Sequence, residues 1–144
     1  MSQLDAAARA FLSRQRVAHL ATVSATGVPH VVPVCFALVD ETIYVAIDEK
    51  PKAGDPRGLR RLRNLAAHPQ VALVADVYDD ADWTRLGFVL VRGTARVHAR
   101  GAEVPEALAA LRGRYAQYGG MGLEERPLIA LGVERVARWG RVEA

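Results

Sequence analysis

Short apolar runs separated by Gly, Pro and Asp dominate the chain, and many of these runs are rich in β-branched residues. Segments of this kind, bounded by turn residues, are typical of strands. The pattern predicts six strands, at residues 17–23, 30–39, 42–48, 70–79, 87–99 and 127–139.

Three further segments carry apolar residues at helical spacing. Residues 3–15 place Leu4, Ala8 and Phe11 on one face, and residues 59–67 do the same with three leucines. Residues 103–117 repeat the pattern. The sequence therefore predicts three helices, of which the second has Arg60, Arg61, Arg63 and Asn64 around its polar side.

The turns between the first three strands are short. SATGVP at 24–29 supplies Gly and Pro for a tight hairpin, and Asp40-Glu41 makes a second turn, so these strands pair antiparallel. Pro33 cannot donate to a ladder and predicts a sheet edge or a bulge. Six strands with few helices favour a mainly β fold, a small closed antiparallel β-barrel with peripheral helices, formed by residues 1–144 as a single domain.

Composition adds only weak constraints. The chain has 144 residues, 51% of them hydrophobic, a net charge of +3 and a pI near 9.4, which weakly favours an anionic partner. The single cysteine, Cys35, excludes a disulfide within the chain and is expected to pack as a small hydrophobe. The N-terminal residues have no signal-peptide pattern and no apolar run is long enough for a membrane span, so we expect a cytoplasmic protein without a membrane partner.

No catalytic motif is evident. The four histidines are scattered without paired spacing, which argues against a metal site. Asp79, Asp80 and Asp82 are expected to form a solvated turn. Because no acid–base pair is apparent, an enzyme with this sequence would depend on a cofactor for its chemistry.

The densest positive charge lies between residues 50 and 63. Lys50 and Lys52 flank Pro51, and Arg60 and Arg63 share a face of the second helix, whose N-terminus lies near residue 58. These groups together suit a phosphate. The alternatives are a solvated helix face and a nucleic-acid site, but the segment lacks the aromatic residues that stack on bases.

The hairpin with TGVPHVVPV, the YVAID strand, the KPK turn and the motif R-N-L-x-x-x-P-x-V-A-L resemble the pyridoxamine 5′-phosphate oxidase-like split β-barrel superfamily over roughly residues 10–140. The DWTRL loop and the final V-E-R-V-x-R-W resemble its actinobacterial branch of probable coenzyme F420-dependent enzymes. The arginine–lysine phosphate signature of true pyridoxamine phosphate oxidases is replaced by Lys-Pro-Lys, which argues against that activity.

This resemblance implies a homodimer with a flavin or deazaflavin in a groove between the protomers. It implies that basic residues after the third predicted strand hold the phosphate, that the ring lies along the second and third predicted strands, and that residues of the partner subunit line the groove. The implied cofactor-binding residues are Lys50, Lys52, Arg60, Arg63, Asn64, Val32, Pro33, Val34, Val45, Ala46, Trp83, Arg85 and Trp139.

The resemblance predicts an F420-dependent oxidoreductase acting on a small unsaturated or quinone-like substrate. F420 carries a phosphodiester and an oligoglutamate tail, so it is more anionic than FMN and better suited to a long basic stretch. The alternatives are an FMN-dependent oxidoreductase on the same barrel and a non-catalytic flavin- or haem-binding module. A haem would need an axial ligand such as His30 or His98.

Overall fold

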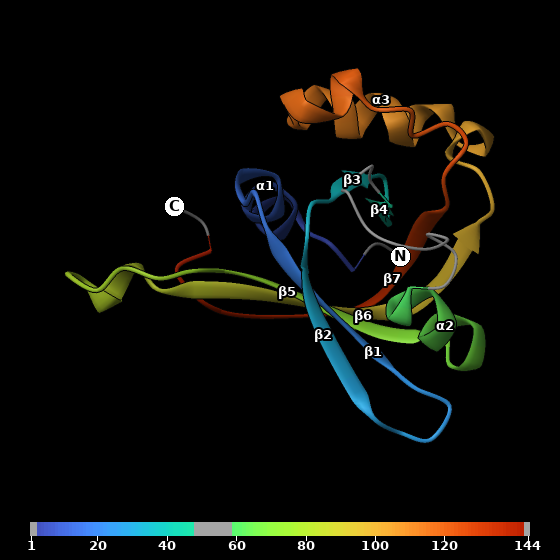
Figure 1. Ribbon diagram of the computed structural model, residues 1–144. Coiled ribbons are helices and arrows are strands. Elements are labelled where there is room, and N and C mark those ends of the chain that lie inside the picture. Colours follow the sequence, from blue (N-terminus) through green and yellow to red (C-terminus); the bar gives the residue numbers. More distant parts are fainter. Residues whose placement is uncertain (1–2, 48–58, 143–144) are drawn as a thin grey trace.

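The structure is a computed structural model that describes residues 3–47 and 59–142, and the described residues form one antiparallel sheet with three α-helices around it (Figure 1). The strands are β1 (Ala18–Val23), β2 (Pro29–Val34), β3 (Ala37–Val39), β4 (Thr42–Ala46), β5 (Gln70–Val77), β6 (Gly87–His98) and β7 (Leu128–Gly140). The helices are α1 (Ala6–Arg14), α2 (Arg60–Ala67) and α3 (Pro105–Arg114).

The sheet has seven strands in the order β2-β1-β5-β6-β7-β4-β3, so β2 and β3 are its two ends. The prediction of antiparallel pairing is confirmed, and Pro33 lies in an edge strand as expected. The prediction of a closed six-stranded barrel is wrong for the described residues. They contain seven strands, and no strand pairing joins β2 to β3.

The extra strand arises because the predicted strand 30–39 is interrupted at Cys35-Phe36. The Tyr115 hydroxyl oxygen accepts a hydrogen bond from the Phe36 N–H at 3.0 Å, and this hydroxyl lies 3.1 Å from the Phe36 carbonyl oxygen. A side chain from the far end of α3 thus takes the place of a neighbouring strand. β2 and β3 can then lie at opposite ends of one sheet.

The third helix is shorter than the predicted 103–117. Val104 precedes Pro105, which occupies the first turn of α3, where its missing N–H costs nothing. One-turn 3₁₀ helices, Gly101–Glu103 and Ala116–Gly120, flank α3 on either side. None of the helices in the described ranges combines the length and apolar character that a membrane span requires.

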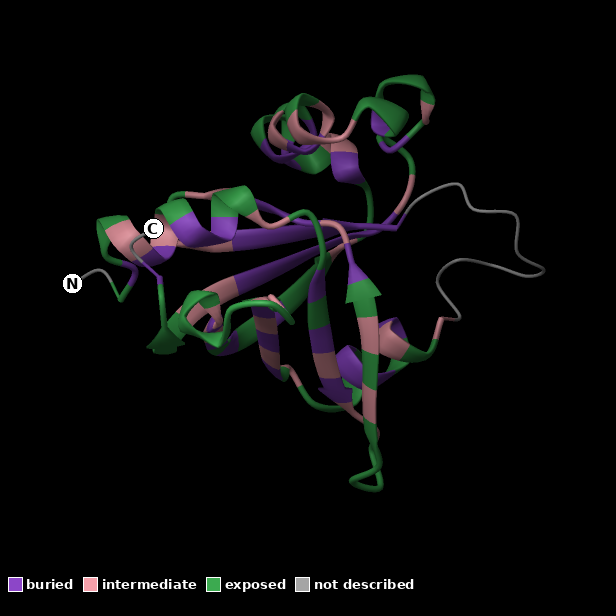
Figure 2. Ribbon diagram, turned by 90° about the vertical axis from the view of Figure 1, so that its left-hand side faces the viewer, coloured by how far each residue is buried: buried purple, intermediate pink, exposed green. Residues whose placement is uncertain are grey.

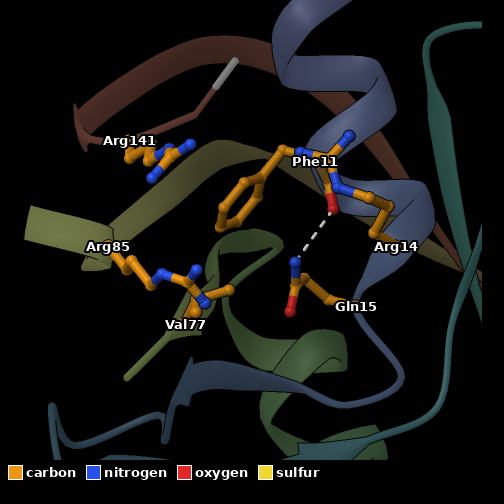
Figure 3. Close-up of a pocket in the computed structure, with 6 residues that line it drawn as sticks. All are labelled: Phe11, Arg14, Gln15, Val77, Arg85 and Arg141. Carbon is orange, nitrogen blue, oxygen red and sulfur yellow. Dashed lines mark hydrogen bonds between the residues drawn. The ribbon is translucent and has the colours of Figure 1, made fainter. Parts of the chain in front are cut away.

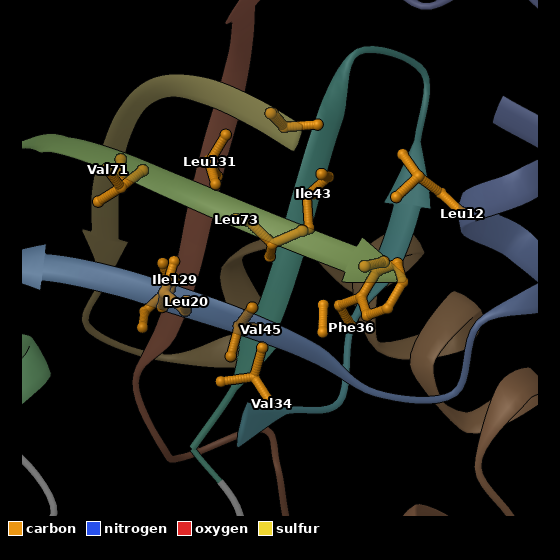
Figure 4. Close-up of a cluster of buried hydrophobic side chains, with 14 of the residues drawn as sticks. Leu12, Leu20, Val34, Phe36, Ile43, Val45, Val71, Leu73, Ile129 and Leu131 are labelled. Atoms are coloured by element: carbon orange, nitrogen blue, oxygen red, sulfur yellow. The ribbon is translucent and has the colours of Figure 1, made fainter. Parts of the chain in front are cut away.

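Burial alternates along the strands, with one side turned into the core and the other towards the surface (Figure 2). The larger core cluster joins α1 and α2 to the inner face of the sheet, and Figure 4 shows part of it, including Val34 of β2 and Val45 of β4. A second cluster packs α3 against β3, β4 and β7. β4 is buried between the two clusters because Val45 belongs to the first and Ala46 to the second.

Candidate functional site

Two backbone edges at the ends of the sheet lack a strand partner. β2 pairs only with β1. The pairing of β3 with β4 ends at Tyr44, so Val45 and Ala46 pair with β7 alone. The family resemblance predicts that the cofactor ring lies along these two segments. The side chains of Val34, Val45 and Ala46 are buried, which leaves their backbone, and the exposed Pro33, for contact with a ligand.

α2 packs against β1 through a buried polar contact. Asn64 is 3% exposed, and its Nδ2 donates a hydrogen bond of 2.9 Å to the hydroxyl oxygen of Thr22, which is 1% exposed. The expectation that Asn64 lies on the polar side of the helix is wrong, because its side chain turns towards the sheet and fixes α2 to β1. Its assignment as a cofactor-binding residue remains a prediction.

Arg60 and Arg63 are both exposed on α2. Within the described part of the chain neither guanidinium makes a hydrogen bond or an ion pair. Leu59 caps the helix without a side-chain acceptor, so the amides of the first turn receive no side-chain partner from it. The two arginines and this helix end are therefore available to an anion. Lys50 and Lys52 lie outside the described residues.

His30 is a residue of this region that sequence reasoning considered only as a haem ligand. It pairs directly with Thr22 across β1 and β2, so its side chain lies on the same face of the sheet as Thr22. Its Nδ1 atom is buried and has no hydrogen-bond partner. A buried polar atom without a partner is costly unless a ligand satisfies it. The signal in the sequence is the position of His30 across the hairpin from Thr22.

A pocket of about 620 Å³ begins where β2 ends. Cys35, which directly follows Val34, lines it together with residues of the segment after α3. The lining is mainly apolar and aromatic, and it includes two arginines. Its residues are Arg16, Val17, Cys35, Arg114, Tyr115, Ala116, Gln117, Tyr118 and Met121.

The polar groups of this pocket are held in place by backbone contacts. Arg114 donates to the carbonyl oxygens of Ser13, at 2.7 Å, and of Gln15, and so satisfies carbonyls at the C-terminal end of α1. The Tyr115 hydroxyl also lies 2.9 Å from the Arg16 carbonyl oxygen. Since the Tyr115 hydroxyl is committed to the backbone, its role is to shape the pocket rather than to deliver a proton.

Trp83, Arg85 and Trp139 lie at the opposite end of the sheet from α2. Trp139 pairs with Phe88 at the start of β6, and their rings stack with centroids 6.1 Å apart. α2 lies beside Ala95 near the end of β6. Seven residues at roughly 3.3 Å each separate these places by about 23 Å. A single chain does not bring the two groups of predicted site residues together.

The acidic loop forms the solvated turn that the sequence predicts. The Asp79 carboxylate accepts hydrogen bonds from the N–H groups of Ala81 and Asp82, and Asp82 caps the 3₁₀ helix Trp83–Arg85. Hydrogen bonds from Thr84 lower the pKa of Asp82, with smaller contributions from nearby arginines. Among the described residues, no three His, Cys, Asp or Glu side chains are grouped as a metal ion would need.

Comparison with known proteins places this geometry in a family. The family model described as pyridoxamine 5′-phosphate oxidase matches residues 4–140. The chain belongs to that family.

Individual relatives differ in what they bind. The chain is 29% identical over 135 residues to a 5a,11a-dehydrotetracycline/5a,11a-dehydrooxytetracycline reductase of Streptomyces rimosus, covering 90% of this chain and 78% of the reductase. A solved structure described as an F420 reductase has a TM-score of 0.62 and 23% identity, covering 90% of this chain and 94% of that one. A haem-binding protein of Mycobacterium smegmatis has a TM-score of 0.74 and 22% identity, covering 97% of this chain and 56% of that one.

The reductase relative supports an oxidoreductase in general terms, and the family supports a flavin or deazaflavin as the cofactor. At these identities the two solved structures establish the fold alone.

Proposed function

We propose that this protein is an F420-dependent oxidoreductase that reduces a small unsaturated or quinone-like compound. The observation that carries the proposal is the pair of unpartnered arginines on α2, beside an edge strand that leads to an apolar pocket. The reduced deazaflavin, when bound, supplies the hydride. The chain binds and orients the two reactants and keeps water away from them.

The anionic part of the cofactor is held at α2. Arg60 and Arg63 offer guanidinium donors to a phosphodiester, and the N-terminal end of the helix adds partial positive charge. His30 presents its buried Nδ1 from the adjoining end of β2. Lys50 and Lys52 belong to the same predicted anion site by sequence. The oligoglutamate tail of F420 extends the negative charge further than FMN does, and it can use several of these cations.

The ring is held at the open edge of β2. Pro29 and Pro33 have no N–H, and prolines are accommodated in an edge strand with their nitrogen facing away from the neighbouring strand. The outer edge of β2 is therefore poor in donors. The flavin atom N5 accepts a hydrogen bond, whereas a deazaflavin has carbon at that position and needs no donor. This difference favours F420 over FMN.

The substrate occupies the pocket that starts at Cys35. Its tyrosines and aliphatic side chains provide an apolar enclosure of about 620 Å³, within the range of small-molecule sites. Because Cys35 follows Val34 directly, a substrate there adjoins the strand assigned to the ring. The walls exclude water from the reacting atoms, and the two lining arginines, Arg16 and Arg114, suit a polar substituent on the substrate.

We also propose that two copies of the chain associate through the outer face of the sheet. Cross-strand partners share a face, so the registers of β2, β1, β5, β6 and β7 define one continuous surface opposite the core. This surface is largely apolar although no other described element covers it. Its apolar members are Val31, Pro33, Ala21, Val74, Ala72, Leu90, Phe88, Ala137 and Trp139.

A second copy also resolves the separation of the predicted site residues. Trp83, Arg85 and Trp139 cannot reach the α2 end of their own chain, but an antiparallel partner would bring its own set to that end. A two-fold dimer presents the same patch from both chains, as a self-complementary apolar face requires.

A haem-binding module is the second candidate. The observation that favours it is again the buried, unpartnered Nδ1 of His30, since a neutral imidazole nitrogen is an axial ligand of haem iron. The haem-binding protein of similar fold is consistent with that reading.

Turnover separates the candidates. Purified protein mixed anaerobically with reduced F420 and a panel of enones and quinones should return the visible absorption of the oxidised deazaflavin only when an acceptor is present. Reduced FMN in the same assay should give a slower reaction. A Soret band on addition of haemin, lost in His30→Ala and accompanied by no turnover with any acceptor, would replace the oxidoreductase by the haem module.

A further inference from the structure

A second polar pocket lies between the C-terminal end of α1 and the tip of the β5–β6 hairpin. Its volume is about 300 Å³ and six residues line it: Phe11, Arg14, Gln15, Val77, Arg85 and Arg141. These residues come from four segments that are far apart in the sequence. Figure 3 shows the guanidinium groups of Arg85 and Arg141 on two sides of the Phe11 ring.

Three arginines around one small pocket form a concentration of positive charge. The Arg14 guanidinium lies 5.9 Å from the centroid of the Phe11 ring and donates to the Val142 carbonyl oxygen at 3.1 Å. Among the described residues, the guanidinium groups of Arg85 and Arg141 make no hydrogen bond. Like charges held close together repel one another, and an anion between them removes that repulsion.

The neighbouring carboxylates of Asp79 and Asp82 form ion pairs with Arg85, but they accept no hydrogen bond from it. Asp79 and Asp82 each lie 3.8 Å from an Arg85 nitrogen, which is beyond hydrogen-bond distance. Asp79 Oδ1 instead accepts from two backbone N–H groups of the loop. Asp82 Oδ1 accepts from the N–H and the hydroxyl of Thr84. The loop keeps both carboxylates, so the donors of Arg85 and Arg141 remain available to a ligand.

The remaining walls define what the ligand is. Phe11 and Val77 provide an apolar surface, and Gln15 is held because its Nε2 donates to the Phe11 carbonyl oxygen at 3.3 Å. A guanidinium fork matches the geometry of a carboxylate. We propose that this pocket, which shares no lining residue with the pocket at Cys35, binds a small organic carboxylate with a flat apolar body.

Calorimetric titration of the full-length protein with benzoate, acetate and inorganic phosphate at constant ionic strength tests this proposal. Benzoate should bind more tightly than acetate, because only benzoate covers the Phe11 and Val77 surface. It should also bind more tightly than phosphate, which has no apolar body. Arg141→Gln and Arg85→Gln should each weaken benzoate binding by about tenfold or more.

Arg60→Ala/Arg63→Ala is the matched control, since it removes two exposed arginines and leaves the pocket intact. Its benzoate affinity should equal that of the unaltered protein. An equal loss in this control would show nonspecific attraction and overturn the site. Unchanged affinity in both pocket variants, or acetate or phosphate binding as tightly as benzoate, would also overturn it. The test is independent of F420, so failure of the proposed function would leave its result unaffected.

Discussion

The side-chain amide of Asn64 donates a hydrogen bond of 2.9 Å to the hydroxyl of Thr22, and both side chains are buried. This contact sets the position of α2 on the sheet. It therefore sets where Arg60 and Arg63 lie relative to β2. The proposed anion site depends on this buried polar pair for the position of its two arginines.

Removing one member of this pair should destabilise the fold. Thr22→Val leaves the Asn64 amide buried without its acceptor, which should cost about 1–3 kcal/mol of unfolding free energy. Asn64→Leu should have a similar cost. The double variant should lose less than the sum of the two, because no polar group is then left unpaired. Urea denaturation of the four proteins measures this coupling, and strictly additive losses would show that the contact contributes nothing specific.

Gly93 should not tolerate a side chain. A Cβ atom at this position would lie 1.9 Å from the Gly132 carbonyl oxygen, where β6 and β7 shift register. Gly93→Ala should destabilise the protein by about 3 kcal/mol or prevent folding. Gly113→Ala is the control, because its Cβ meets nothing within 4 Å and should stabilise α3 by up to about 1 kcal/mol. Thermal unfolding compares them, and equal midpoints would contradict the close approach of the two strands.

Acid should loosen the wall of the Cys35 pocket. Arg112 donates to both Glu124 oxygens, at 2.6 and 3.0 Å, and to the carbonyl oxygens of Tyr118 and Met121. The hydrogen bond from Arg112 is the main cause that lowers the pKa of Glu124 from 4.5 to about 2. A carboxyl group whose pKa is lower in the folded protein stabilises the fold at pH values above its pKa in the unfolded chain. This contribution to stability is lost as the pH falls towards the pKa in the folded protein.

Glu124→Gln should therefore reduce the dependence of stability on pH between about 4.5 and 2. Glu106→Gln removes an exposed carboxylate that has no ion pair among the described residues, and should leave that dependence nearly unchanged. Denaturation midpoints across the acid range provide the measurement. An equal dependence of stability on pH in Glu124→Gln and in the unaltered protein would mean that the ion pair between Arg112 and Glu124 does not form in solution.

The outer face of the sheet should hold the proposed dimer together. Leu90→Glu places a charge near the middle of this face, opposite Ala137, and should shift the protein to a monomer in light scattering. Val97→Glu is the control, because Val97 is even more exposed and lines a groove beside α2. This variant should keep the mass of a dimer. A monomeric unaltered protein, or a Leu90→Glu variant that remains dimeric, would argue against this interface.

Much of the fold could be predicted from the sequence because local patterns fix which residues face inward. Leu62 and Leu65 are buried as their spacing predicts, and Pro33 lies at an edge because proline lacks an N–H. The break at Phe36 could not be found this way, since the Tyr115 hydroxyl that replaces the ladder comes from 79 residues away. The burial of Asn64 could not be predicted for the same reason, because its partner Thr22 lies in the distant strand β1.

The candidate site was only partly predictable. Spacing indicated a shared face for Arg60 and Arg63, and the structure agrees. Residue spacing could not show that Arg85 lines the same pocket as Arg14 and Arg141, because that pocket forms where α1 packs near the tip of the β5–β6 hairpin. Nor could it show that Trp139 lies at the opposite end of β6 from α2.

The most direct test of the central claim is a titration of the apo-protein with F420 and with FMN, followed by the quenching of tryptophan fluorescence. F420 should bind more tightly than FMN. Arg60→Ala/Arg63→Ala should weaken F420 binding by about tenfold to a hundredfold, since it removes charge-assisted hydrogen bonds to the phosphodiester. Arg9→Ala, which removes a cation of α1 that pairs with Glu41, should bind F420 normally. Tighter binding of FMN, or F420 affinity unchanged by loss of Arg60 and Arg63, would contradict the account.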